Sequence, residues 1–143
     1  MKKMMWSSVG LAAAFMAGFA AHGVVSGASV ANAQAASRVF ELRTYTPAEG
    51  KLDLLHARFR HHTLRIFQRH GMTNVWYGKP VDAPLSQTTL IYMLAHQSRE
   101  AAKKSWDGFR ADTEWMAVAK ESGVGPVKVE SVFLEPTDYS PMK

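Results

Sequence analysis

The stretch Arg38-Val-Phe-Glu-Leu-Arg-Thr-Tyr-Thr46 alternates two kinds of side chain along its length. Its apolar positions hold Phe40, Leu42 and Thr44, and its polar positions hold Glu41, Arg43 and Tyr45. Because successive side chains of a strand point to opposite faces, the pattern predicts a β-strand with one apolar and one polar face. We expect the apolar face to pack against helices. The polar face, with an acid, a base and a phenol in a row, is the first candidate site.

The segment after this strand has the signals of a long helix. Thr46 is a suitable N-cap, Pro47 suits the first helical position and Glu49 completes a capping box. Gly71 is typical of a helix stop, so a helix is predicted over 47–70.

Three more strands and two more helices complete the pattern. The strands are predicted over 72–79, 88–96 and 127–134. Ser98 is expected to cap a second helix, and Asp112 a short further helix that ends at Gly123. The order of elements predicts an α+β, ferredoxin-like βαββαβ fold with an extra short helix before the last strand.

The connections of this fold place the first and third strands in the middle of the sheet and both helices on one face. The third strand, Thr88 to His96, is nearly all apolar and is expected to be buried on both sides. A bare, partly apolar sheet face favours association. We therefore expect a homodimer in which two sheets face each other and close a dimeric α/β barrel.

Residues 1–35 are expected to be a signal peptide and residues 36–143 the mature domain. Lys2 and Lys3 precede an apolar run from Val9 to Val25, and small-x-small cleavage sites lie within 31–35. An uncleaved anchor is the alternative, but the run is slightly short for a span. Cleavage predicts a periplasmic or secreted protein.

Composition excludes several classes of site. The chain has no cysteine, which rules out disulfides, thiolate zinc sites and iron–sulfur clusters. Loss of the signal segment, which holds no acid, lowers the formal net charge from +5 to +3, so nucleic acid is not an expected partner. The histidine spacings match no metal motif, and we expect neither a metal nor a cofactor, with haem on one axial histidine as the open alternative.

Three segments resemble the NIPSNAP family. They are Phe40 to Thr46, the region of His62 with Arg69-His70-Gly71, and Asp112-Thr113-Glu114-Trp115. Phe40 and Thr113 depart from the tyrosine and proline usual there. The resemblance implies a dimeric α+β barrel of a superfamily that includes cofactor-free monooxygenases, lactone isomerases and haem-handling enzymes. NIPSNAP proteins themselves are known mainly as partners in membrane traffic and mitochondrial quality control.

His62, Arg43 and Tyr45 are the candidate residues for catalysis. A histidine can act as acid or base near neutral pH, and an arginine beside a phenol can hold a carboxylate or enolate oxygen. The alternatives are a histidine that hydrogen-bonds at the helix boundary and a plain ion pair of Glu41 with Arg43.

Aromatic side chains could form the walls of a pocket. The candidates for ligand binding are Glu41, Trp76, Tyr92 and Trp115. Aromatics at such spacings are more often core residues, and we expect at least one of the three to be so.

A basic stripe is expected along the first helix. At 100° per residue, Lys51, Arg58, Arg65 and Arg69 fall within a narrow arc. Such a stripe could bind anionic lipid or an acidic partner, although a solvated basic face is the usual case.

These features support three hypotheses of function. The first is an exported, homodimeric binding protein for a small apolar or weakly acidic ligand or for a protein partner. The second is a cofactor-independent monooxygenase or isomerase, and the third is a membrane-surface interaction module.

Overall fold

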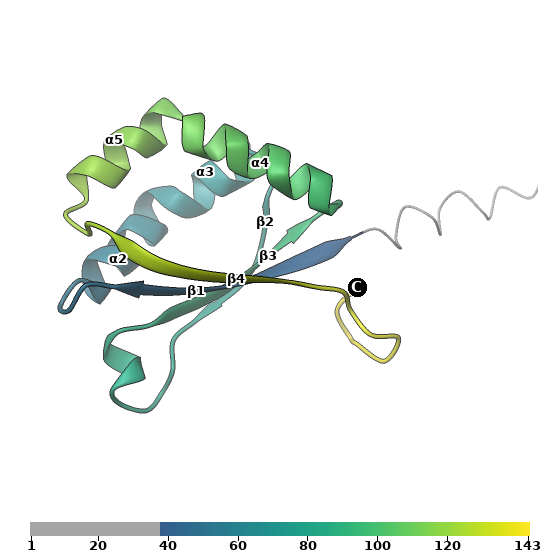
Figure 1. Ribbon diagram of the computed structural model, residues 1–143, viewed down its shortest axis with the longest axis horizontal. Helices are drawn as coiled ribbons and strands as arrows, with labels where there is room; N and C mark the ends of the chain where they lie inside the picture. Colours follow the sequence, from purple (N-terminus) through teal and green to yellow (C-terminus); the bar gives the residue numbers. More distant parts are fainter. Residues whose placement is uncertain (1–37) are drawn as a thin grey trace, which may run out of the picture.

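The computed structural model describes residues 38–143 and has one four-stranded antiparallel sheet with helices on one face (Figure 1). The strands are β1 (Val39–Pro47), β2 (Thr73–Gly78), β3 (Leu90–His96) and β4 (Val127–Leu134). Their order in the sheet is β2-β3-β1-β4, so the first and third strands lie in the middle as predicted. The predicted α+β, ferredoxin-like class is confirmed. The expected signal peptide lies outside the described residues.

The helices differ in length and type. They are α2 (Leu52–Arg58), the π-helical turn η1 (Phe59–Thr63), α3 (Leu64–Arg69), the 3₁₀ turn η2 (Leu85–Gln87), α4 (Arg99–Ala111) and α5 (Thr113–Glu121). The first three form one continuous rod, since the residues that join them keep helical backbone angles. The extra short helix expected before the last strand is α5.

The predicted start of the first helix is wrong. Pro47 is the last residue of β1 and lies opposite Val127 of β4. The chain then turns at Gly50, whose φ is +71°, and the helix begins at Leu52. Pairing with β4 therefore overrides the local capping signal, and a proline is tolerated because it stands at the strand end.

The other helix boundaries follow their sequence signals. The Ser98 hydroxyl accepts a hydrogen bond from the backbone N–H of Ala101 at 3.1 Å, and the Asp112 carboxylate accepts one from Trp115 at 3.0 Å. Gly71 has a φ of +78° directly after α3. These caps define the starts of α4 and α5 and the end of α3.

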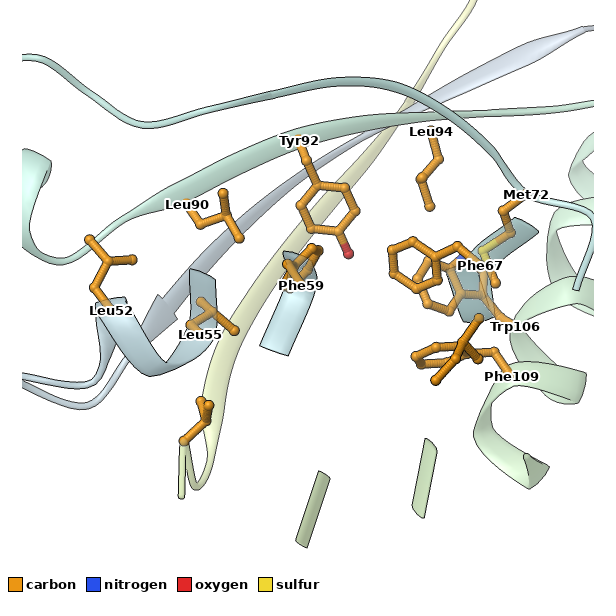
Figure 2. Packing of buried hydrophobic residues seen from close by; sticks show 12 residues of the cluster. Leu52, Leu55, Phe59, Phe67, Met72, Leu90, Tyr92, Leu94, Trp106 and Phe109 are labelled. Carbon is orange, nitrogen blue, oxygen red and sulfur yellow. The ribbon is translucent and has the colours of Figure 1, made fainter. Parts of the chain in front are cut away.

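The core lies between the sheet and the helices (Figure 2). Figure 2 shows Tyr92 reaching from β3 toward Phe59, and Phe67 lying close to Trp106. Burial of each such large apolar side chain contributes roughly 1.5–3 kcal/mol to the stability of the fold.

The polar row of β1 faces the helices, opposite to the expectation. Directly paired residues of antiparallel strands share a face. On β3 the partners of the row are Leu94, Tyr92 and Leu90, which are all buried in the core under the helices. Alternation correctly separates the two faces of β1, but it does not say which one is covered. We expected Glu41, Arg43 and Tyr45 to face away from the helices, toward the barrel of a dimer, and this expectation is wrong.

The opposite face of the sheet carries apolar side chains without a helix layer (Figure 1). Ile91 and Met93 of β3 are half-buried there, so β3 is not fully buried on both sides within one chain. Trp76 and Val132 are 51% and 49% exposed on the same face. The tail after β4 lies beside this face, where it lines a hollow together with Phe40 and Met93.

Candidate functional site

Glu41 is the centre of a buried polar cluster on β1. Its carboxylate is 2% exposed and accepts hydrogen bonds from four side chains. The donors are Arg43 Nη1 at 2.5 Å, Ser131 Oγ at 2.6 Å, Trp106 Nε1 at 2.7 Å and His96 Nε2 at 3.0 Å. Four different elements therefore converge on one acid.

This cluster keeps Glu41 ionised. Burial by itself raises the pKa of the carboxyl, but the four donors outweigh that effect and lower its pKa to about 2. Nε2 of His96 is hydrogen-bonded to this carboxylate. The other ring nitrogen, Nδ1, has no hydrogen-bond partner among the described residues. The cluster is thus a fixed anion inside the protein.

Arg43 is held between the acid and aromatic rings. Its guanidinium lies 4.1 Å from the ring centroid of Trp106 and 5.5 Å from that of Tyr45. Nη2 is 3.4 Å from the Tyr45 hydroxyl. Burial lowers the pKa of Arg43, but the neighbouring phenols and Glu41 together raise it by more. The pKa of Arg43 therefore lies above its ordinary value. The predicted Glu41–Arg43 ion pair is present.

Arg58 lies in the interior and not on an exposed stripe. Arg58 is 6% exposed, and its guanidinium carbon lies 5.1 Å from the ring centroid of Trp115. Arg58 follows the buried Leu52 and Leu55 at intervals of three residues, so the regular turn of α2 already places it on the buried side. In the π-turn that follows, the Thr63 hydroxyl donates to the Arg58 carbonyl oxygen at 3.2 Å. A π-turn adds about one residue to the helical turn, which rotates the later positions relative to a regular 3.6-residue helix.

The remaining arginines of the expected stripe form ion pairs with acids at the start of α5. Arg65 forms an ion pair with Glu114, and Arg69 forms ion pairs with Asp112 at 2.7 Å and with Glu114 at 2.9 Å. Lys51 stands apart at the N-cap of α2. The expectation of one continuous exposed stripe is wrong, and binding of an anionic partner to it remains a prediction.

His62 lies on the π-turn and is half-buried. Its ring is 6.5 Å from that of His61, centroid to centroid. Within the described part of the chain it makes no side-chain hydrogen bond, and no contact joins it to Arg43 or Tyr45. The structure therefore does not bring together the three residues predicted for catalysis, and a catalytic role of His62 stays a prediction.

The three predicted pocket aromatics lie in different places. Trp76 pairs with Met93 on the bare face of the sheet, whereas Tyr92 is fully buried in the core on the helix side. Trp115 is half-buried beside Arg58. A single pocket lined by all three is therefore wrong, and Tyr92 is the core residue that we expected among them.

His96, Trp106 and Ser131 belong to the site although sequence reasoning missed them. They lie 55, 65 and 90 residues from Glu41. The only local signal is the acid itself, since an acid inside an otherwise apolar strand pair needs several donors.

Residues 38–143 hold no group of three metal-ligating side chains. Over the same residues, no helix is long and apolar enough to cross a membrane.

The comparisons with known proteins identify the family. A family model for NIPSNAP matches residues 40–141. The chain belongs to the NIPSNAP family. No curated protein matches it in sequence.

Solved structures of NIPSNAP proteins share the fold. A NIPSNAP family protein from Agrobacterium tumefaciens is 23% identical, with 74% of this chain and 99% of that chain covered and a TM-score of 0.65. A NIPSNAP-like domain protein from Burkholderia xenovorans is 16% identical, with coverages of 74% and 90% and a TM-score of 0.64. SnoaB from Streptomyces nogalater, a cofactor-independent oxygenase, is 12% identical, with coverages of 74% and 99% and a TM-score of 0.52. At these identities the likeness concerns the fold alone.

Proposed function

We propose that this NIPSNAP protein is an exported, homodimeric binding protein that holds a small apolar or weakly acidic molecule on the helix side of β1. The observation that supports it is the arrangement around Arg43. Glu41 fixes one edge of the guanidinium, Trp106 covers its face, and the Tyr45 hydroxyl lies at its other edge.

Such a site is preorganised for binding. Arg43 and Tyr45 already have their positions in the folded protein, so a ligand does not have to order them. Tyr45 is half-buried, and Val129, its partner on β4, is 43% exposed on the same face. The helices therefore leave the β4 side of this site open, which gives a ligand a way in.

The test is a search for a bound molecule. Native mass spectrometry of protein purified without refolding should detect a small molecule on the wild type. We expect Tyr45→Phe to weaken its retention while the melting temperature changes little, because this substitution removes only a hydroxyl with one long hydrogen bond. Trp76→Phe, on the opposite face of the sheet, is the matched control. Retention that is equal in all three proteins would place the ligand elsewhere.

The homodimer part of the proposal is supported by the bare apolar face of the sheet. The alternative is that a different protein binds this face, as the first hypothesis of function also allows. A second copy is our choice because the face is apolar at its centre, and a two-fold dimer pairs a patch with the same patch of the second copy.

An enzyme is the second candidate, namely a cofactor-independent monooxygenase or isomerase. It is favoured by the Arg43–Tyr45 pair, which can hold an enolate oxygen, together with the fold shared with the oxygenase SnoaB. Turnover of a substrate that His62→Ala abolishes would support this candidate. Turnover that persists in that variant would remove His62 from it.

Export is proposed from the N-terminal segment alone. N-terminal sequencing of the mature protein should begin after residue 33 or 35. A chain that begins at Met1 in the membrane fraction would instead indicate an anchor. The membrane-surface module is a third proposal, weakened because Arg65 and Arg69 are ion-paired to α5.

A further inference from the structure

Three buried hydrogen-bond donors near Tyr45 have no acceptor among the described residues. They are Nε of Arg43, Nε of Arg58 and the hydroxyl of Tyr92. The fourth buried polar atom without a partner, Nδ1 of His96, lies beyond Glu41 along the β1–β3 pair and can accept a hydrogen bond. Unsatisfied groups of this kind are rare in folded proteins and call for an explanation.

The three donors belong to one neighbourhood. Tyr92 lies directly opposite Arg43 in the β1–β3 register and on the same face. The Tyr45 ring contacts that of Tyr92 at 5.1 Å, and the charge of Arg58 is close enough to both phenols to interact with them. The β1–β3 pair and the end of α2 thus bring the donors to the same layer between sheet and helices.

Arg58 carries the stronger signal because its charge has no counter-ion. Arg43 is paired with Glu41, whereas within residues 38–143 no carboxylate forms an ion pair with Arg58. Burial lowers the pKa of Arg58, with the phenols of Tyr45 and Tyr92 opposing that effect. An arginine nevertheless stays protonated at neutral pH, so this is a buried positive charge that the described residues do not neutralise.

We infer that Arg58, with the hydroxyl of Tyr92, is the receptor for the charged end of a small aromatic carboxylate or a related planar organic anion. A carboxylate supplies the acceptor oxygens that these donors lack, and a guanidinium binds it through two parallel hydrogen bonds. The Trp115 ring beside the guanidinium suits a flat apolar body. The inference deepens the proposed binding function and rests on it.

The test compares charged and neutral probes at constant ionic strength. Benzoate and phenylacetate should raise the melting temperature of the wild type and bind, by calorimetry, about tenfold or more tightly than benzamide and phenylacetamide. Arg58→Met should lose this preference, and Arg58→Lys should keep part of it, because lysine retains the charge without the planar fork. Arg110→Met, at an exposed arginine of α4, is the control and should keep the preference.

A second measurement needs no ligand. In a buffer poor in organic anions, Arg58→Met should melt at or above the wild type, because it removes a buried charge without a partner. Arg43→Met should melt well below it, because that substitution leaves Glu41 without its ion pair. If Arg58→Met falls as far as Arg43→Met, Arg58 is a structural cation and the inference is wrong.

The outcomes separate this inference from the proposed function. Equal binding of charged and neutral probes, or a preference that survives Arg58→Met, overturns the inference but leaves a ligand-binding protein. No effect of any carboxylate on the wild type, with a water molecule on Arg58 in a crystal soaked with benzoate, also overturns it. A small molecule found by native mass spectrometry would still support the proposed function in that case.

Discussion

At the scale of single residues, the site depends on one acid. Glu41 neutralises Arg43 and orients Trp106, Ser131 and His96, which reach it from three other elements. A buried carboxylate of this kind is tolerated only with its full set of donors. Substitutions here should therefore cost more than the loss of any single hydrogen bond.

We expect Glu41→Gln to lower the free energy of unfolding by about 3–5 kcal/mol at pH 7, because it leaves Arg43 buried without a counter-charge. Urea unfolding measures the change. Asp107→Asn, at an exposed acid of α4, is the control and should be nearly neutral. A Glu41→Gln variant within 1 kcal/mol of the wild type, on the scale of an ordinary surface substitution, would contradict the central role of Glu41.

The same carboxylate should make stability depend on pH. Its pKa is lowered from 4.5 to about 2 on folding, so its contribution is complete above pH 4.5 and is lost as the pH falls to about 2. The shift corresponds to about 3 kcal/mol. The difference in unfolding free energy between the wild type and Glu41→Gln should shrink over this window. A difference that stays constant between pH 5 and pH 2 would show that Glu41 is not the titrating group.

At the scale of secondary-structure elements, two contacts between helices position the site. Arg58, at the end of α2, lies inward against Trp115 of α5. Arg65, Arg69 and His70, at the end of the first helical rod, are tied to the start of α5 through Asp112 and Glu114. These ion pairs are exposed on the arginine side, so they set the direction of α5 more than they contribute to stability.

Gly108 of α4 tests how closely these helices pack. A Cβ at this position would lie 2.8 Å from Nδ1 of His70, whose Nε2 is hydrogen-bonded to Asp112 at 2.7 Å. We expect Gly108→Ala to destabilise the protein by roughly 1–2 kcal/mol, because overpacking outweighs the gain in helix propensity.

A double-mutant cycle with His70→Ala provides the control for this prediction. Once the imidazole is removed, Gly108→Ala should stabilise α4 by up to about 1 kcal/mol, as alanine does in an ordinary helix interior. Thermal unfolding of the four proteins gives the coupling. Stabilisation by Gly108→Ala in the wild-type background would show that His70 moves aside freely.

At the scale of the whole molecule, we expect the bare sheet face to determine the assembly. Trp76 and Val132 expose large apolar side chains on it, and Ile91 and Met93 lie between them. Association would remove this surface from water, and burial of apolar area contributes roughly 25 cal/mol per Å².

We expect a dimer at micromolar concentration and a monomer after Val132→Asp, because a charge buried in such an interface stays unpaired. Light scattering measures both states. Val129→Asp, on the opposite face of the same strand, is the matched control and should remain dimeric. A wild type that is monomeric at this concentration would leave the face to a different partner.

The sequence by itself was sufficient for the architecture. Strand β4 has the predicted bounds, the caps at Ser98 and Asp112 are where their side chains predict them, and the strand order follows from short right-handed connections. These features depend on residues close together in the chain, so local patterns contain the information.

Only the tertiary structure decided the site. Alternation along β1 separates Glu41 from Phe40, but which face the helices cover depends on donors 55 to 90 residues away. The separation of Arg65 and Arg69 from Arg58 depends on a π-turn between them that a fixed period of 3.6 residues does not describe. The energy of a buried charge depends on the charges, hydrogen-bond donors and apolar groups around it in space. A linear sequence pattern does not show which residues these are.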